Sequence, residues 1–487
     1  QPEEIEQAMQ LAEQAFQNYK HSSGQKRANF LRTIAQEIEA LGDELIHRAM
    51  QESGLPEGRL KGERGRTVNQ LRLFAQVAEE GSWVEASIDQ AQADRQPFPK
   101  PDIRKMLVPI GPVVVFTASN FPLAFSTAGG DTASALAAGN PVIVKAHESH
   151  LGTNALVALA ISKAAQKTGM PEGVFSSLNG TGPDLGQQLV KHPLCKAVAF
   201  TGSHAAGKAL FDSAAQRSVP IPVFAEMGSI NPVFLLQERL EQDAVALAQQ
   251  YAASVLLGVG QFCTNPGLII GVDSPALQQF IEILSEAFQQ SLPATMLNEK
   301  VCVNYNKGRT ELLNFPGVQL EGQAPPSEAS HQGIATVASV GIQDFLNQPL
   351  LQQEVFGPFT LIVRCDAPDD LTTIAQQLSG QLTATIMGSE AELATVASLI
   401  NGLQDRVGRL LFNGVPTGVE VCHSMHHGGP YPATTDSRFT SVGTDAIKRF
   451  ARPLVFQNWL PDLLPAALQT DNPLMIWRKV DGVMGKA

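Results

Sequence analysis

Residues 106–118 read MLVPIGPVVVFTA, and they open a regular alternation of short apolar runs and helix-like segments. Three further runs follow the same plan: PVIVKA (141–146), VFSSLNG (174–180) and KAVAFTGS (196–203). Short buried strands that alternate with helices are typical of a parallel sheet wound by right-handed crossovers. The first half of the chain therefore predicts an α/β fold.

The same alternation restarts in the second half. After PVFAEMGSINPVFLL (222–236) comes a helix-like segment from about 243 to 257, then the run GLIIGV (267–272) and a helix near 275–290. A chain of 487 residues is also longer than one ordinary core can fill, which favours two or three domains. We expect a second parallel-sheet α/β domain that begins near Gly228.

Three segments are expected outside the two sheets. The first 80 or so residues predict amphipathic helices that cover a sheet, because one face of ANFLRTIAQEIEAL (28–41) carries Phe30, Leu31, Ile34 and Ile38. Residues 88–103 are polar and contain prolines, which indicates a hairpin or arm. The tail from Asn458 is broken by prolines yet apolar, so we expect it to dock on its own domain or on a neighbouring subunit.

Composition excludes several classes of protein. The 35 Lys and Arg against 47 Asp and Glu leave a net charge of −12, which argues against nucleic acid as a partner. No run approaches the roughly 18 to 20 apolar residues of a membrane span, and the N-terminus shows no signal-peptide pattern. The five scattered cysteines form no C-x-x-C pair, which favours a reducing, cytoplasmic compartment; they are Cys195, Cys263, Cys302, Cys365 and Cys422.

Two glycine-rich segments are candidates for holding phosphates. GTGPDLG (180–186) resembles a dinucleotide fingerprint, but its third glycine comes one position late and Pro183 disturbs the turn. In FTGSHAAG (200–207) a strand runs into Gly202 and Ser203 and then into a helix, whose free backbone N–H groups could hold a pyrophosphate. The same pattern also fits an ordinary strand-to-helix turn.

A cysteine and a glutamate are the candidates for covalent chemistry. Glu226 ends an apolar strand in AEMGSINP (225–232), where an α/β fold presents catalytic groups, although an ion-paired glutamate would look the same. Cys263 lies in GVGQFCTNPG (258–267) beside small glycines, and a lone cysteine is often simply core. Together they predict a thiol nucleophile with a carboxylate base.

Six segments, in order along the chain, resemble the motifs of the aldehyde dehydrogenase family. They are ASNFPLAF (118–125), VIVKAHE (142–148), FTGSHAAG (200–207), AEMGSINP (225–232), GQFC (260–263) and EVFGP (354–358). The closing segment 412–453, and EMGSINP in place of the more common ELGGK-type motif, resemble one branch of this family. That branch contains the 2-oxoglutarate semialdehyde (2,5-dioxovalerate) dehydrogenases and a related bacterial fatty aldehyde dehydrogenase.

The resemblance implies oxidation of an aldehyde to a carboxylic acid with NAD or NADP. Cys263 would be the nucleophile, Glu226 the base that activates water, and Asn120 a donor to the oxyanion. The residues implied for the cofactor are Lys145, Glu148, Gly202, Ser203, Glu354 and Phe356. Because Glu148 beside a ribose would repel a 2′-phosphate, and the loop 200–207 has no arginine, we expect NAD with NADP tolerated.

The resemblance also implies an aldehyde dehydrogenase-like fold with a Rossmann-like cofactor domain. We expect this domain over 1–227 with an arm at 88–103, a catalytic domain over 228–425, a return to the cofactor domain over 426–457 and an oligomerisation tail over 458–487. A homodimer or homotetramer would follow.

The cluster CHSMHH (422–427) has the residue types of a metal site, but the resemblance points to a pocket-lining segment without metal, with His427 near the thiol. Arg438 could bind the carboxylate of a semialdehyde. Phe121, Phe125 and Phe262 could instead line a tunnel for a long-chain aldehyde.

We expect 2-oxoglutarate semialdehyde as the substrate, with a medium- or long-chain fatty aldehyde as the alternative. Two other classes stay open: a catalytically silent binding or structural protein, and a thioesterase that uses the thiol and the base without hydride transfer.

Overall fold

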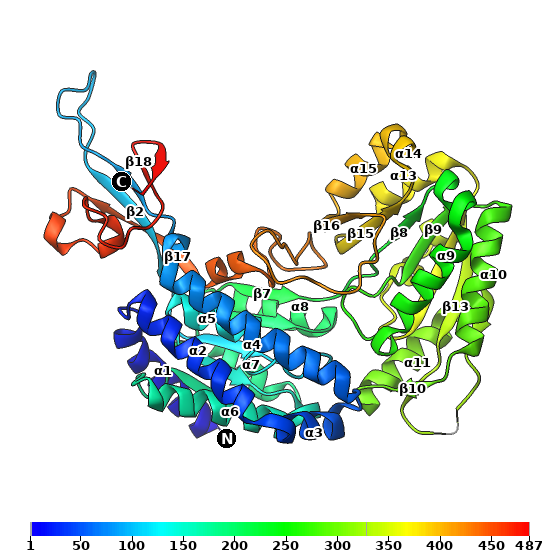
Figure 1. Cartoon of the computed structure of the whole chain (residues 1–487), viewed down its shortest axis with the longest axis horizontal. Coiled ribbons are helices and arrows are strands. Elements are labelled where there is room, and N and C mark those ends of the chain that lie inside the picture. Colours follow the sequence, from blue (N-terminus) through cyan, green and yellow to red (C-terminus); the bar gives the residue numbers. More distant parts are fainter. Residues whose placement is uncertain (1, 328, 487) are drawn as a thin grey trace.

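The computed structural model describes residues 2–327 and 329–486. Figure 1 shows two α/β units beside each other and a narrow third sheet that extends away from the first unit. The first unit surrounds a five-stranded sheet and the second a seven-stranded one. The predicted α/β class with two parallel-sheet units is confirmed.

The first sheet is fully parallel and has the order β5-β4-β3-β6-β7. Its strands are β3 (Val113–Phe116), β4 (Val142–Lys145), β5 (Phe175–Leu178), β6 (Ala197–Thr201) and β7 (Val223–Glu226). The chain starts at the centre, winds outward to β5 and then returns to β6 on the other side of β3. The strand order therefore reverses between β3 and β6, and ligands of such folds bind beyond the carboxyl ends of the strands at that point.

Alternate side chains of this sheet fill two cores. Val113 and Val115 of β3 pack with the helices on one face, and Val114 packs with those on the other. Phe30, Leu31, Ile34 and Ile38 are buried, as the helical spacing predicts. The helices of this unit are α1 (Pro2–Tyr19), α2 (Gly24–Ala40), α3 (Gly42–Ser53), α4 (Glu57–Glu80), α5 (Gly130–Ala138), α6 (Leu151–Lys167), α7 (Asp184–Lys191) and α8 (His204–Ala215).

The second sheet has the order β11-β13-β14-β9-β8-β15-β16, in which only β11 runs antiparallel. Its strands are β8 (Val233–Leu235), β9 (Leu268–Val272), β11 (Gln319–Gln323), β13 (Thr336–Gly341), β14 (Phe359–Cys365), β15 (Gln381–Met387) and β16 (Val407–Phe412). A short pair, β10 (Ala294–Thr295) and β12 (Gln332–Gly333), lies outside it.

Helices cover both faces of the second sheet. They are α9 (Gln237–Leu256), α10 (Pro275–Gln290), α11 (Glu299–Leu313), α12 (Ile342–Asn347), α13 (Pro368–Gln377), α14 (Glu390–Thr395) and α15 (Ala397–Gln404). Helix α9 begins before the predicted residue 243, and its backbone leaves helical geometry at Asp243. Within the described part of the chain, no helix is both long and apolar enough to cross a membrane.

The third sheet joins distant segments in the order β17-β2-β1-β18-β19. Its strands are β1 (Ser87–Asp89), β2 (Ile103–Pro109), β17 (Ala451–Gln457), β18 (Arg478–Val480) and β19 (Val483–Gly485). The sequence predicts 106–118 as a single apolar run, but the structure divides it between β2 and β3, which belong to two different sheets. The chain breaks the run at Gly111, whose φ of 122° is one that side chains rarely adopt, and at the following proline.

The polar excursion and the apolar tail both belong to this third sheet. Residues 90–102 project beyond β1 and β2 as a hairpin tip (Figure 1). The tail pairs with β1 through β18 and buries Leu468 and Ile476 against the first unit. Several of its large apolar side chains stay exposed: Trp459, Leu460, Leu463, Leu474, Met475, Trp477, Val483 and Met484.

Candidate active site

One cavity of about 570 Å³ lies between the two units. The carboxyl ends of β3, β4, β6 and β7 supply one wall, and loops of the second unit together with the start of α11 supply the other. All residues predicted as catalytic or cofactor-binding line it: Asn120, Lys145, Glu148, Gly202, Ser203, Glu226, Cys263, Glu354 and Phe356. The structure therefore brings together residues that lie up to 236 positions apart in the chain, from Asn120 to Phe356.

A left-handed run of backbone positions Cys263. Gly258, Val259 and Gly260 have φ values of 58°, 59° and 63°. A Cβ at Gly260 would lie 2.2 Å from the carbonyl oxygen of Gly357, so this position requires glycine. Val259 is β-branched, and its left-handed conformation stores strain four residues before Cys263.

Asn231 fixes the loop that carries Cys263 to the segment that follows Glu226. Its side-chain amide donates hydrogen bonds to the backbone oxygens of Cys263, at 2.8 Å, and Asn265, at 2.9 Å. The Asn120 amide donates to the backbone oxygen of Gln261 at 3.1 Å. Side-chain amides from both units therefore anchor the loop that carries Cys263.

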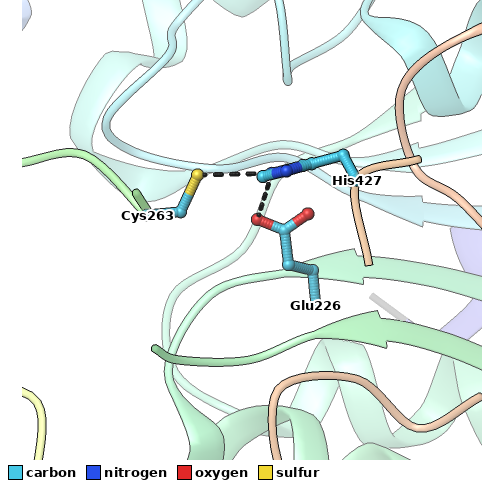
Figure 2. Close-up of side chains that lie close together, drawn as sticks. All are labelled: Glu226, Cys263 and His427. Atoms are coloured by element: carbon cyan, nitrogen blue, oxygen red, sulfur yellow. Dashed lines mark hydrogen bonds and ion pairs between the residues drawn. The ribbon is translucent and has the colours of Figure 1, made fainter. Parts of the chain in front are cut away.

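Figure 2 shows His427 between the thiol and the carboxylate. Its Nε2 atom lies 3.5 Å from Sγ of Cys263 and 3.1 Å from Oε1 of Glu226. The hydroxyl of Ser441 donates to Oε2 of Glu226 at 2.8 Å. This geometry provides a path for a proton between the sulfur and the carboxylate.

The electrostatics of the group keep the thiol neutral and the carboxylate charged. Burial, and then the negative charge of Glu226, raise the pKa of Cys263 well above its ordinary value. Burial alone would raise the pKa of Glu226, but the His427 charge and the hydrogen bonds from His427 and Ser441 bring it below its ordinary value. Glu226 is thus available as a base at neutral pH, and the thiol needs an acceptor for its proton.

The far end of the cavity suits an adenosine ribose. Lys145 and Glu148 lie there together with Lys300 of α11. Burial lowers the pKa of Lys145, with Glu148 opposing this shift and Lys300 adding to it. A carboxylate for ribose hydroxyls and two ammonium groups are therefore available at one place.

The middle of the cavity suits a pyrophosphate and a second ribose. Gly202 and Ser203 precede the first turn of α8, where the helix dipole favours negative charge. Burial raises the pKa of Glu354 to about 8, so its carboxyl group is largely protonated near neutral pH. A Cβ at Gly228 would lie 3.0 Å from Oε2 of Glu354, and glycine leaves this approach open. The cavity thus fits a dinucleotide along its length.

The pocket residues predicted for the substrate are only partly brought together. Phe121 packs edge-on against Phe125 and Phe262, with ring centroids 5.1 Å and 5.5 Å apart, beside Asn120 and Cys263 in the chain. The side chain of Arg438 is instead 79% exposed and forms an ion pair with Asp436 at 2.6 Å. The structure therefore does not bring Arg438 to the site.

The CHSMHH segment contributes only its last residue. His427, Cys263 and Glu226 offer ligand atoms that all lie within 4.8 Å of one another, and this is the single such group of His, Cys, Asp and Glu among the described residues. These three side chains could hold a thiophilic cation. Cys422, His423 and His426 do not join them.

Three residues at the site were not singled out by the sequence. Asn231 lies inside the motif AEMGSINP and could have been noticed there, since an asparagine that follows a glycine and serine at a strand end often bonds to backbone. Ser441 lies in the closing segment and Lys300 at the start of a helix. The residues around them form no motif that would predict a role at the site.

Comparisons with known proteins agree with this site. The model of the aldehyde dehydrogenase family matches residues 1–303. An alpha-ketoglutaric semialdehyde dehydrogenase 2 of Azospirillum brasilense is 51% identical over 479 residues, which cover 98% of this chain and 91% of that protein. An alpha-ketoglutaric semialdehyde dehydrogenase of Acinetobacter baylyi is 48% identical, with 99% and 91% covered.

A solved structure of 3,6-anhydro-L-galactose dehydrogenase in complex with NAP superposes with a TM-score of 0.78 at 22% identity, covering 93% of this chain and 91% of that one. This likeness shows the aldehyde dehydrogenase fold. The chain belongs to the aldehyde dehydrogenase family, and it is an NAD(P)-dependent aldehyde dehydrogenase.

Proposed function

We propose that this enzyme oxidises 2-oxoglutarate semialdehyde to 2-oxoglutarate, with Cys263 as nucleophile and Glu226 as base. The observation that carries the chemistry is the contact of the His427 imidazole with both the Cys263 thiol and the Glu226 carboxylate at one end of the long cavity. The names of the two relatives near 50% identity support the choice of substrate.

The first step joins the thiol to the aldehyde. Nε2 of a neutral His427, in the tautomer that leaves this nitrogen without hydrogen, accepts the proton of Sγ, and the thiolate attacks the aldehyde carbon, whose oxygen becomes an oxyanion. The charged imidazole that results then donates to Glu226. The Asn120 amide and the Cys263 backbone N–H stabilise this oxyanion. A nicotinamide held near Glu354 and Phe356 would supply the acceptor for the hydride of the aldehyde carbon, which would leave a thioester on Cys263.

The second step releases the acid. The Glu226 carboxylate, whose pKa is lowered, accepts a proton from a water molecule that attacks the thioester carbon. The C–S bond breaks, the sulfur regains a proton from His427 or Glu226, and the carboxylic acid leaves. Lys145, Glu148, Gly202, Ser203, Glu354 and Phe356 would hold the dinucleotide.

An assay of reduced nicotinamide tests this proposal with three aldehydes: 2-oxoglutarate semialdehyde, pentanal and a long-chain aldehyde. We expect the highest kcat/KM for the semialdehyde. A higher value for the long-chain aldehyde would favour the alternative that the Phe121, Phe125 and Phe262 cluster supports. Ester hydrolysis alone would indicate a thioesterase, and no activity with either nucleotide would indicate a silent protein.

For the cofactor we propose that NAD is preferred and NADP accepted. Glu148 repels a 2′-phosphate, whereas Lys145 and Lys300 at the same end attract it. We expect Glu148→Gln to shift the kcat/KM ratio toward NADP by about tenfold, and Lys300→Ala to shift it toward NAD by a similar factor. Initial rates with both nucleotides measure this ratio.

Glu286→Gln is the matched control, because Glu286 is exposed on α10 and does not line the cavity. It should leave the ratio unchanged. A wild-type ratio that strongly favours NADP would show that the proposed preference is wrong.

We further propose the division into a cofactor unit (1–227 and 426–457) and a catalytic unit (228–425), and a homodimer or homotetramer built through the arm and tail. Met227 and Thr435 support the return of the chain, since Met227 N–H donates to the oxygen of Ala433 and Thr435 N–H to that of Ala225. The exposed apolar side chains of 458–487 support subunit contact. The five free cysteines fit a cytoplasmic location.

Truncation before Asn458 is expected to lower the assembly to monomers in sedimentation, because it removes these apolar side chains and β18. An unchanged assembly would contradict the role of the tail.

A further inference from the structure

Two guanidinium nitrogens of Arg66, near the active site, have no hydrogen-bond partner among the residues that the structure describes. Arg66 lies on α4, and its Nε and Nη2 atoms are buried with no polar partner among the described residues. Arg66 is partly buried as a whole, and burying two of its nitrogens without a partner costs free energy that native proteins seldom leave unused. This group therefore calls for an anion.

The rings of Phe121 and Phe125 lie near the guanidinium of Arg66, and Phe121 also neighbours Asn120 in the chain. Its guanidinium carbon lies 5.9 Å from the ring centroid of Phe121 and 5.4 Å from that of Phe125. Phe121 follows Asn120 in the chain and packs against Phe262, which precedes Cys263. Arg66 therefore lies behind the aromatic cluster that borders both the oxyanion donor and the nucleophile.

The neighbouring carboxylates are unable to neutralise this charge. Glu63 is fully engaged, because Oε2 accepts from Arg59 at 2.6 Å and Oε1 accepts from the backbone N–H groups of Leu123 and Ala124 at 2.8 and 2.9 Å. Glu420 influences Arg66 only from an exposed position. Burial lowers the pKa of Arg66, and the nearby Cys263, Glu63 and Glu420 offset this shift only in part.

The two free nitrogens are the pair that grips a carboxylate side-on. Arg104 holds Asp102 through its Nε and Nη2 atoms at 2.9 and 3.1 Å, and Arg438 holds Asp436 in the same way at 2.9 and 2.6 Å. Such two-point pairs combine charge with geometric specificity. In Arg66 no described residue uses this pair.

We propose that Arg66 binds the carboxylate of the semialdehyde substrate and so selects it over neutral aldehydes. This inference rests on the proposed function, because it assigns the end of the substrate that does not react. The aldehyde would face Cys263 and Asn120, and the short carbon chain would pass the ring of Phe121. A neutral aldehyde of the same length would contact the rings but leave the guanidinium unpaired.

The test compares 2-oxoglutarate semialdehyde with pentanal, a neutral aldehyde of equal chain length, in wild type and in Arg66→Met. We expect kcat/KM for the semialdehyde to fall about 10- to 100-fold, mainly through KM, as for a lost hydrogen bond to a charged group. The value for pentanal should change less than about threefold. Arg66→Lys keeps the charge but loses the two-point geometry. Its kcat/KM for the semialdehyde should lie between those of wild type and Arg66→Met.

Arg72→Met is the matched control, because Arg72 lies on the same helix but pairs with Glu39 at the surface. It should change neither substrate. A wild type that prefers pentanal would overturn the proposed function, whereas a preference for the semialdehyde that survives in Arg66→Met would overturn only the role of Arg66.

A second measurement decides the matter if Arg66→Met does not fold. 2-Oxopentanoate has the substrate's carboxylate end and carbon skeleton but a methyl group in place of the aldehyde. It should inhibit pentanal oxidation competitively in wild type and about three- to tenfold more weakly in Arg66→Lys. Equal inhibition of the two proteins would contradict the proposal.

Discussion

Cys263→Ala is expected to lower kcat for aldehyde oxidation by at least about 10⁴-fold, because no other thiol lines the described cavity and loss of a catalytic nucleophile removes the covalent route. Dinucleotide binding should persist, since its contacts come from other residues. The measurements are single-turnover formation of reduced nicotinamide and a binding titration with the oxidised nucleotide.

Cys422→Ala serves as the control for this change. Its thiol is also free and partly buried, but it does not line the cavity, so turnover should stay within about twofold of wild type. Cys263→Ala that retained a few per cent of wild-type turnover would exclude the covalent mechanism.

The pH dependence of alkylation checks the same thiol in the wild-type enzyme. The neutral thiol is favoured because the pKa of Cys263 is raised, so the reactive thiolate appears only as the pH rises past that elevated value. Iodoacetamide should therefore label Cys263 more slowly at pH 7 than an ordinary thiol, and labelling should accelerate at more alkaline pH. Rapid labelling that levels off below pH 8 would contradict the assigned direction.

Glu226→Gln is expected to separate the two halves of the reaction. Formation of the thioester should continue, but its hydrolysis should slow by about 10² to 10⁴-fold because no base activates water. One equivalent of reduced nicotinamide per site should appear rapidly, followed by a slow steady state. Mass spectrometry of the quenched enzyme should find the acyl group on the peptide that contains Cys263.

Glu286→Gln on α10 is the corresponding control and should show no burst beyond that of wild type. A Glu226→Gln enzyme that lost the burst and the steady rate equally would instead place Glu226 in the activation of the thiol. Mass spectrometry distinguishes the two roles, because an enzyme that fails to activate the thiol would not accumulate the acyl group on Cys263.

Much of the fold was predictable because its signals are local. Short β-branched runs, helical spacing and glycine at strand ends depend on neighbours in sequence, and they placed Glu226 and Gly202 correctly at carboxyl ends of strands. The division of 106–118 between two sheets was not predictable, since an apolar run does not reveal which sheet its ends join. The pairing of Ser87 with Lys479 depends on segments nearly 400 residues apart.

At the site, too, residues in local motifs were predictable from the sequence, and residues placed by tertiary contacts were not. The motifs predicted Cys263, Glu226 and Asn120, because each motif places one reactive side chain after one backbone turn. Arg438 was chosen for its charge alone, and the structure shows it bound to Asp436 two residues away. Arg66 gave no signal because it is one of several arginines on a polar helix, and only the tertiary structure leaves it unpaired.

The proposed nucleophile and its proposed base lie on different units. Cys263 lies on a loop that leads into the second sheet, whereas Glu226 ends a strand of the first. Neither unit alone carries all of the proposed catalytic residues. Activity therefore depends on how the two units pack against each other. A small rotation of one unit against the other would move Glu226 away from Cys263. Hydrolysis of the thioester would then be lost although both hydrophobic cores stay intact.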